Sequence, residues 1–383
     1  MKRLIEMSIF TALYTFFSAV AIAATGESLS VTPVPLDPSI ESSFLQRRQS
    51  AHVLVDPKCR IWDRTVIKWK DGRYHAYYSR WKGEHRRWLT DSEVCHAVAD
   101  KPEGPFRDTG VVLENRNADG WDLIDAHSQF ALTVEDKILL YYQSDDLRGK
   151  FEPQKDSPLP TRAWLDDKRN SKTLRNSQRL GVAVSENPAG PFERAERPVA
   201  TPDDCERIKN ITDNPAVVYR DGRYLMIMKS DDAQRTGWHR IQVVGHSRNP
   251  QGPFQFSNEP VYSEKQTEDA TVWYDKLNRH YYMVCHVLGE SALAMFTSLD
   301  GLKWQHASQP ILMKKEFLLS NGEIWKPERV EQPRVLTDDN GKPVMLYVAV
   351  AYKGINGNIA IPLKTIRQGR INAVQQADSV EPR

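Results

Sequence analysis

The chain has 383 residues, a length that suits one large domain or two ordinary ones. Its 40% hydrophobic and 27% charged residues are an ordinary globular mixture. The formal net charge is only +2, so charge gives no reason to expect nucleic acid or an anionic membrane as a partner.

The chain begins with the features of a secretory signal peptide, which we predict over residues 1–23. Basic residues precede an apolar run over 9–20, and Ala21-Ile22-Ala23 resembles a cleavage site. The apolar run is too short and too interrupted for a membrane-spanning helix. We therefore expect a secreted or periplasmic protein with no membrane attachment after removal of the signal.

Residues 24–50 contain Pro and Ser without a clear period, and we expect an N-terminal arm or linker with a short helix near 43–50. Residues 51–383 are expected to form the folded domain. Four cysteines fall within it: Cys59, Cys95, Cys205 and Cys285. Their spacing is irregular and lacks CxxC, so we favour buried free thiols over disulfides, although an exported protein would permit either.

One pattern recurs five times after the arm: an acidic residue, a β-rich run, a turn and a second β-rich run. The clearest copy spans 210–229, where Asp221-Gly222 separates two apolar runs and predicts a hairpin. The copies recur at roughly 60-residue intervals, apart from one longer interval. That interval contains residues 146–178, a polar stretch that we expect to be a long loop. The five acidic residues are Asp63, Asp125, Asp213, Glu268 and Glu331.

A strand, a Pro/Gly turn and an aromatic residue follow each of the first four hairpins. The aromatic residues are Phe106, Phe192, Phe254 and Trp304. Each copy thus predicts four antiparallel strands, and five such units are typical of an all-β, five-bladed β-propeller. A β-sandwich is the alternative, but it does not explain five copies in one polar phase. The fifth copy ends near 358–363 and needs another part of the chain to complete it.

The first strand of each propeller blade lines the central channel, so we expect the five acids to converge on one mouth. A single acidic residue before a strand is often only a turn-former, but five in phase favour a site. Like charges held close together shift one another's pKa and can be divided into an acid and a base. Paired carboxylates of this kind cleave glycosidic bonds. We find no serine-hydrolase, zinc-protease, P-loop or dinucleotide signature.

Three of these motifs resemble, in order and phase, the five-bladed glycoside hydrolases of families 43 and 117. They are IWDRTVI around Asp63, ITDNPAVVYRDGRY around Asp213 and TEDATVWY around Glu268. The resemblance implies that Asp63 is the general base and Glu268 the general acid, while Asp213 orients the sugar and tunes the pKa of Glu268. It also implies a homodimer through the N-terminal arm, and inversion of configuration, which needs the two carboxyls roughly 6.5–9.5 Å apart.

Further candidate substrate contacts come from the second and fifth copies. They are Asp125, His127, Glu331, Gln332 and Arg334. Asp125 and His127 either contact substrate or form structural hydrogen bonds. Arg334 either clamps a hydroxyl, carboxylate or sulfate through its planar fork or pairs with a channel acid.

Aromatic residues and basic loops add alternatives that the sequence leaves open. Trp81, Trp88 and Trp238 either stack on a sugar face or pack in the core. The basic loops over 82–87 and 146–178 face either an acidic or sulfated glycan or, as we favour, solvent.

The sequence as a whole predicts an exported, exo-acting, inverting glycoside hydrolase that cleaves a plant or algal oligosaccharide. This chemistry needs no organic or redox cofactor. A structural divalent ion such as calcium is compatible with the fold, but no ligand set is recognised, so no metal site is predicted. The alternative is a non-catalytic glycan-binding propeller. The enzyme is favoured because acids, not aromatics, hold the positions in phase.

Overall fold

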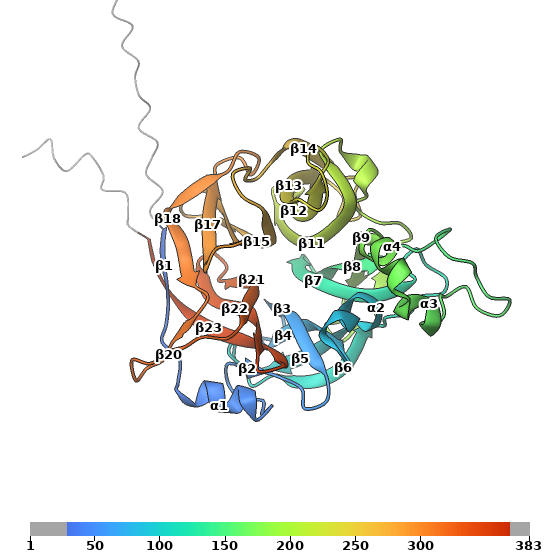
Figure 1. The fold of residues 1–383 in the computed structure, drawn as a ribbon. Helices are drawn as coiled ribbons and strands as arrows, with labels where there is room; N and C mark the ends of the chain where they lie inside the picture. Colours follow the sequence, from blue (N-terminus) through green and yellow to red (C-terminus); the bar gives the residue numbers. More distant parts are fainter. Residues whose placement is uncertain (1–28, 368–383) are drawn as a thin grey trace, which may run out of the picture.

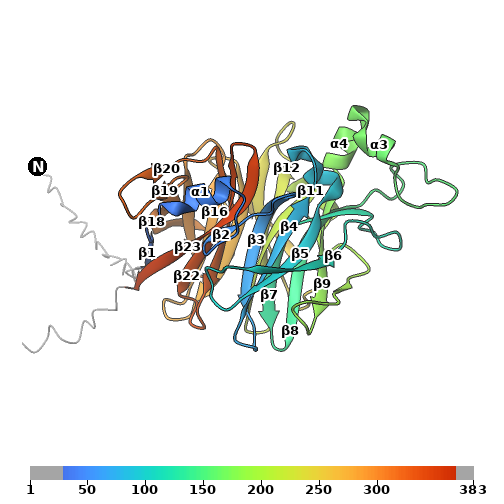
Figure 2. The same ribbon diagram turned by 90° about the horizontal axis from the view of Figure 1, so that it is seen from below.

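The computed structural model describes residues 29–367, which form five β-sheets arranged around a central axis (Figures 1 and 2). The protein is a five-bladed β-propeller of four-stranded antiparallel blades, as the repeats predicted. The predicted signal peptide over residues 1–23 lies outside the described residues. No helix within residues 29–367 has the length and apolar character needed to span a bilayer.

The first four blades each contain four antiparallel strands that are consecutive in the chain. The strands of the first blade are β3 (Arg60–Lys68), β4 (Tyr74–Trp81), β5 (Glu93–Ala99) and β6 (Arg107–Leu113). Those of the second are β7 (Ile124–Val134), β8 (Lys137–Asp145), β9 (Gln178–Ser185) and β10 (Glu193–Arg194). Those of the third are β11 (Ile208–Arg220), β12 (Arg223–Asp232), β13 (Arg240–Ser247) and β14 (Gln255–Pro260). Those of the fourth are β15 (Thr267–Asp275), β16 (His280–Val287), β17 (Ala292–Ser298) and β18 (Gln305–Lys314).

The fifth blade joins the two ends of the described chain. Its strands are β21 (Arg329–Thr337), β22 (Pro343–Tyr352), β23 (Ile355–Arg367) and β1 (Leu29–Pro33). β1 pairs with the end of β23, and β2 (Val53–Leu54) pairs with its beginning. The predicted domain boundary at residue 51 is therefore wrong, because residues assigned to an arm form the outer strand of this blade.

Besides the blade strands, the structure contains short helices and one small hairpin. They are α1 (Ser39–Leu45), η1 (His85–Arg87), α2 (Trp88–Asp91), α3 (Arg162–Asp166), η2 (Lys168–Asn170), α4 (Ser171–Arg175), η3 (Pro202–Asp204), β19 (Phe317–Leu318) and β20 (Ile324–Trp325). The predicted helix near 43–50 begins earlier than expected, at Ser39.

The long loop expected over 146–178 contains α3, η2 and α4, which lie together at one edge of the molecule (Figure 2). Leu147, Leu165 and Leu174 of this insertion pack in an apolar cluster with Leu123 and Ile124 of the second blade. That cluster fixes the insertion against the propeller, since burying each leucine stabilises the contact by about 1.5–3 kcal/mol.

The inner strands β3, β7, β11, β15 and β21 contact one another in that order, and β21 contacts β3 to close the ring (Figure 1). Apolar and aromatic residues fill the spaces between blades, among them Tyr141, Met226, Met283 and Tyr347, all fully buried. The four cysteines are buried free thiols, as favoured from their spacing. The ring places the inner-strand residues of all five blades around one channel.

Candidate active site

Each inner strand contains a β-bulge at or beside the acidic residue of its blade. The residue at the bulge has a left-handed backbone conformation in all five blades: Asp63, Asp125, Asn214, Asp269 and Gln332, with φ between 47° and 68°. Pairing with the second strand shifts register there. Asp213, Glu268 and Glu331 therefore stand one position before the bulge, whereas Asp63 and Asp125 stand on it. The prediction that the five acids occupy equivalent positions just before the strand is wrong.

A pocket opens at the mouth of the channel, and its wall combines charged and aromatic side chains. The charged side chains are those of Arg175, Asp213, Lys229, Glu268, Asp269, Arg329 and Glu331. The aromatic ones are Trp62, Trp81, His85, Trp88 and His127. Among the predicted site residues, His127, Asp213, Glu268, Glu331 and Gln332 lie on this wall.

Lys229 links two of the predicted catalytic carboxylates. Its Nζ lies 3.0 Å from Oδ2 of Asp213 and 3.6 Å from Oε2 of Glu268. Burial alone would raise the pKa of Asp213, but the adjacent Lys229 charge holds that pKa below its ordinary value. The same carboxylates raise the pKa of Lys229 against the effect of its own burial. Asp213 and Lys229 are therefore both charged at neutral pH, and Glu268, with 21% of its side chain exposed, faces the pocket beside them.

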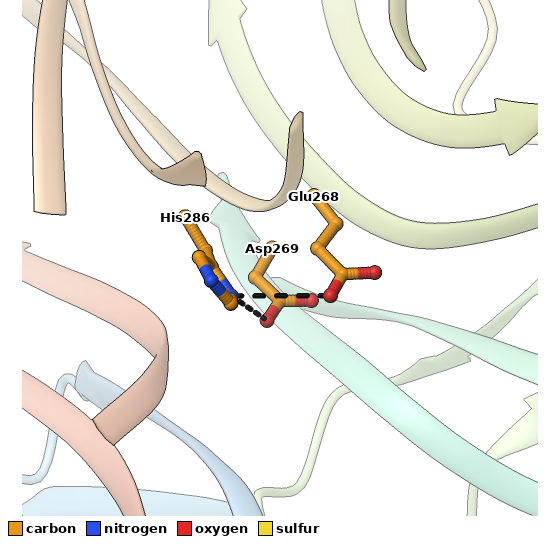
Figure 3. A group of neighbouring side chains, drawn as sticks. All are labelled: Glu268, Asp269 and His286. Carbon is orange, nitrogen blue, oxygen red and sulfur yellow. Dashed lines mark ion pairs between the residues drawn. The ribbon is translucent and has the colours of Figure 1, made fainter. Parts of the chain in front are cut away.

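Glu268, Asp269 and His286 form a second group on the fourth blade (Figure 3). Nδ1 of His286 lies 3.8 Å from Glu268 Oε1 and 3.9 Å from Asp269 Oδ2, and this buried nitrogen has no hydrogen-bond partner. The three ligand atoms lie within 4.8 Å of one another. One nitrogen and two carboxylates suit a transition-metal ion better than calcium, which prefers oxygen ligands. The positive Lys229 beside Glu268 opposes a second cation there.

The fifth blade contributes an ion pair and a hydrogen bond to the pocket wall. Arg329 donates to both carboxylate oxygens of Glu331, at 2.9 and 2.8 Å. Gln332 Nε2 donates to Asp269 Oδ1 at 2.8 Å. Burial raises the pKa of Glu331, and the neighbouring Asp269 charge adds to that rise. Glu331 and Gln332 therefore lie on the pocket wall, where Arg329 and Asp269 engage their polar atoms.

Arg334 does not lie on the pocket wall. It is 2% exposed, and its Nη1 donates to the backbone oxygen of Ala270 at 2.7 Å. Neither predicted role describes this geometry, since the guanidinium forms no ion pair with a carboxylate of the described residues. Burial lowers the pKa of Arg334, while the charges of Asp63, Asp269 and Asp213 oppose that fall. Arg334 places a positive charge beneath the pocket acids.

Asp63, the predicted base, is fully buried beneath His127. Its Oδ2 lies 3.0 Å from Nε2 of His127, and Ser79 Oγ donates to the same oxygen at 3.5 Å. Nδ1 of His127 lies 2.9 Å from Ser92 Oγ. The imidazole also stacks on Trp88, with ring centroids 4.8 Å apart. His127, not Asp63, therefore forms the wall of the pocket.

Asp125 is also buried and does not reach the pocket wall. Its Oδ2 accepts a hydrogen bond from Gln143 Nε2 at 3.0 Å. Burial raises the pKa of Asp125 well above its ordinary value, and the negative charge of Asp145 raises it further. Asp125 therefore does not contact substrate as predicted, because its carboxyl is enclosed within the second blade and forms a structural hydrogen bond.

Several pocket residues were missed by sequence reasoning. Lys229 interrupts the apolar run of β12, and a charged residue in a buried strand is a usable signal. Asp269 follows directly after Glu268 in the fourth motif. Arg175 ends α4, whose position depends on how the insertion folds back over the second blade.

The structure separates the three tryptophans whose roles the sequence left open. Trp81 and Trp88 lie on the pocket wall together with Trp62, whereas Trp238 does not and is 54% exposed. Trp62 and Trp81 are buried and pack in an apolar cluster with Ala349, so Trp81 is mainly a core residue, whereas Trp88 is only half-buried. The site therefore combines carboxylates, cations and flat apolar surfaces.

Solved glycoside hydrolases share this fold. A family 117 glycoside hydrolase of the marine bacterium Zobellia galactanivorans is 13% identical, with 89% of this chain and 91% of that chain covered and a TM-score of 0.55. A family 43 β-xylosidase/α-arabinofuranosidase from a compost metagenome is 15% identical, covering 84% and 96%, with a TM-score of 0.53. An endo-arabinase from Bacteroides thetaiotaomicron is 11% identical, covering 84% and 99%, with a TM-score of 0.52.

No protein-family model matches the sequence, and neither does any curated protein. The identities to the solved structures are low, so the likeness concerns the fold. The chain has the five-bladed propeller fold of family 43 and family 117 glycoside hydrolases, as its motifs implied.

Proposed function

We propose that the protein is an exported glycoside hydrolase that removes terminal sugars from an oligosaccharide with inversion of configuration. The observation that carries the proposal is Glu268, a partly exposed carboxyl in an aromatic-walled pocket, beside the buried Asp213–Lys229 ion pair. Glu268 is the general acid that protonates the leaving oxygen. Asp213 stays ionised and orients the sugar.

The water-activating base must lie across the pocket from Glu268. Asp269 does not meet this requirement, because its carboxylate and that of Glu268 approach within 4.8 Å, whereas inversion needs roughly 6.5–9.5 Å between carboxyl groups. Asp63 comes from the first blade, which is not adjacent to the fourth in the ring. We assign the base to Asp63, with the His127 ring turning aside when a sugar enters.

The shape of the pocket wall supports an exo mode of action. Trp88 of α2 and Arg175 of α4 stand together on one side, with the guanidinium 5.2 Å from the Trp88 ring centroid. This side is built in part from the insertion in the second blade, which contains α4. It limits the length of chain that lies across the channel mouth, which suits removal of terminal sugars.

A glycan-binding protein without catalysis is the second candidate, and the burial of Asp63 favours it. A protein that lacks an accessible water-activating carboxylate would bind sugars in the same pocket without cleaving them. The two candidates differ in one measurable result, the release of reducing sugar.

The test measures release of reducing sugar from a panel of plant and algal oligosaccharides by the wild type, Asp63→Asn and Glu268→Gln. Exposed Glu290→Gln serves as the control. Proton NMR of the first product identifies its anomer. We expect an inverted product and near-complete loss of activity in both site variants. Cleavage of nothing in the panel, or full activity in both variants, contradicts the proposal.

A further inference from the structure

Arg175 is the cation of the pocket wall that the proposed hydrolysis leaves unused. It is the last residue of α4, in the insertion between β8 and β9, and it is half-buried. Its guanidinium lies 5.2 Å from the centroid of the Trp88 ring, and that ring stacks in turn on His127. Stacking on an indole fixes the plane of a guanidinium and favours Arg over Lys.

The other pocket cations have carboxylate partners. Lys229 pairs with Asp213 at 3.0 Å, and Arg329 holds Glu331 in a two-point contact. Within residues 29–367, no carboxylate forms an ion pair with Arg175.

One neutral group fixes one corner of the Arg175 fork. With the Gln178 amide nitrogen donating to Asp213 Oδ2 at 3.3 Å, its oxygen accepts from Arg175 Nη1 at 3.0 Å. In that orientation the fully buried Gln178 amide holds one corner of the guanidinium. Five N–H donors form the fork, and the others have no hydrogen-bond partner among the described residues, which leaves them available for a ligand.

The charges around the pocket also permit an anionic ligand. The wall holds four carboxylates, Asp213, Glu268, Asp269 and Glu331. Three wall cations, Arg175, Lys229 and Arg329, face them, and buried Arg334 adds a fourth positive charge beneath. Asp63, buried beneath His127, adds a fifth carboxylate, so the four cations offset most of the negative charge. Arg175, which has no carboxylate partner among residues 29–367, is the place on the wall where an anionic group meets least repulsion. Burial lowers the pKa of Arg175, yet arginine stays charged at neutral pH.

We propose that Arg175 selects a sugar with an anionic substituent, binding a carboxylate or sulfate oxygen through its free N–H groups beside Trp88. A planar fork on a fixed plane is the geometry that recognises both anions through two parallel hydrogen bonds. The inference rests on one part of the proposed function, namely that a sugar binds in this pocket. It deepens that function by naming the substrate class as a uronic acid or a sulfated sugar.

The test compares matched sugars by titration calorimetry: galacturonate with galactose, glucuronate with glucose, and galactose 6-sulfate with galactose. The proteins are the wild type, Arg175→Gln, Arg175→Lys and Arg169→Gln. Arg169 belongs to the same insertion but is exposed and pairs with Asp167, so it is the matched control. The two acid pairs report a carboxylate ligand, and the sulfate pair reports a sulfate ligand.

We expect the wild type and Arg169→Gln to bind at least one anionic sugar about tenfold or more tightly than its neutral match. Arg175→Gln should bring that ratio close to one, and Arg175→Lys should restore only part of it. Equal affinities within each pair, no binding of any sugar, or an equal loss in Arg169→Gln overturns the inference. Hydrolysis of neutral glycosides alone leaves the proposed function standing while the inference fails. Anion-selective binding without hydrolysis supports the inference while the proposed function fails.

Discussion

His127 Nε2 lies 3.0 Å from Asp63 Oδ2, so an imidazole from the second blade covers a carboxylate from the first. Both ring nitrogens of His127 have partners, since Nδ1 lies 2.9 Å from Ser92 Oγ. The ring is also held by stacking on Trp88. Any chemistry by Asp63 therefore depends on movement of this ring, and the carboxylate and its cover should be tested as one unit.

Asp63→Asn should lower kcat by about 10²–10⁴-fold, the usual contribution of a general base, with little change in KM. KM should change little because Asp63 is buried and does not line the pocket. The measurement is steady-state kinetics on an oligosaccharide that the wild type cleaves. Asp125→Asn is the matched control, because Asp125 occupies the same bulge position in the next blade. Loss of activity in Asp125→Asn alone would move the base to the second blade.

Lys229→Met should lower the free energy of unfolding by about 3–5 kcal/mol, because it leaves Asp213 buried without a counter-charge. Urea denaturation at neutral pH measures the loss. Adding Asp213→Asn to Lys229→Met should recover most of it, since the uncompensated charge is then gone. Lys265→Met is the control: its pair with Glu290 is exposed and should contribute less than about 1 kcal/mol. Equal losses in both lysine variants would contradict a special role for the buried pair.

Asp145→Asn should stabilise the protein at pH 8 and have no effect near pH 3. Burial raises the pKa of Asp145 well above its ordinary value, although the nearby charges of Lys150 and Arg175 oppose the rise. A raised folded-state pKa favours folding below the unfolded pKa of about 3.9, and this contribution is lost as the pH rises through the folded-state pKa. Removing the charge by Asp145→Asn should therefore raise the free energy of unfolding at pH 8 by about 1 kcal/mol or more.

Thermal and urea unfolding across pH 3–8 measure this effect. Asp122→Asn is the comparison, because Asp122 is equally buried but accepts hydrogen bonds from Asn117, Tyr142 and Arg194. It should destabilise the protein at pH 8. A loss of stability at pH 8 in Asp145→Asn would contradict the prediction, because it would mean that the folded protein stabilises the charged form of Asp145.

Trp88→Ala should raise KM about tenfold or more, because it removes the indole that holds His127 and Arg175 in place on the pocket wall. Kinetics with the cleaved oligosaccharide, and calorimetry with its free sugar, measure the change. Trp238→Ala should leave both values unchanged, since Trp238 is 54% exposed and lies outside the pocket wall. Similar effects in the two variants would argue against a role for Trp88 in shaping the pocket.

Val31→Asp should destabilise the propeller by about 3 kcal/mol or more, because it places a charge on the buried face of β1. Thr32→Asp, on the exposed face of the same strand, should change the unfolding midpoint little. Differential scanning calorimetry compares the two. Equal stability of both variants would show that β1 adds nothing to closure of the fifth blade.

The sequence by itself determined the blade architecture, because the signals for each blade are local. The Asp221-Gly222 turn and its flanking apolar runs specify one hairpin within about 20 residues. Repetition of that pattern then implies a radial fold, since a single blade cannot bury both of its faces alone. His127, Asp213 and Glu268 were found in the same way, because the inner strands bring residues in phase to one channel.

Only the tertiary structure decided which of those residues face the pocket. The bulge position depends on pairing with the second strand, and one residue of offset turns Asp63 and Asp125 away from the positions of Asp213 and Glu268. Closure of the fifth blade by β1 pairs Leu29 with Arg367, at opposite ends of the described chain, which no local pattern specifies. The place of Arg175 likewise depends on how the insertion packs over the second blade, because only that packing sets its guanidinium on Trp88.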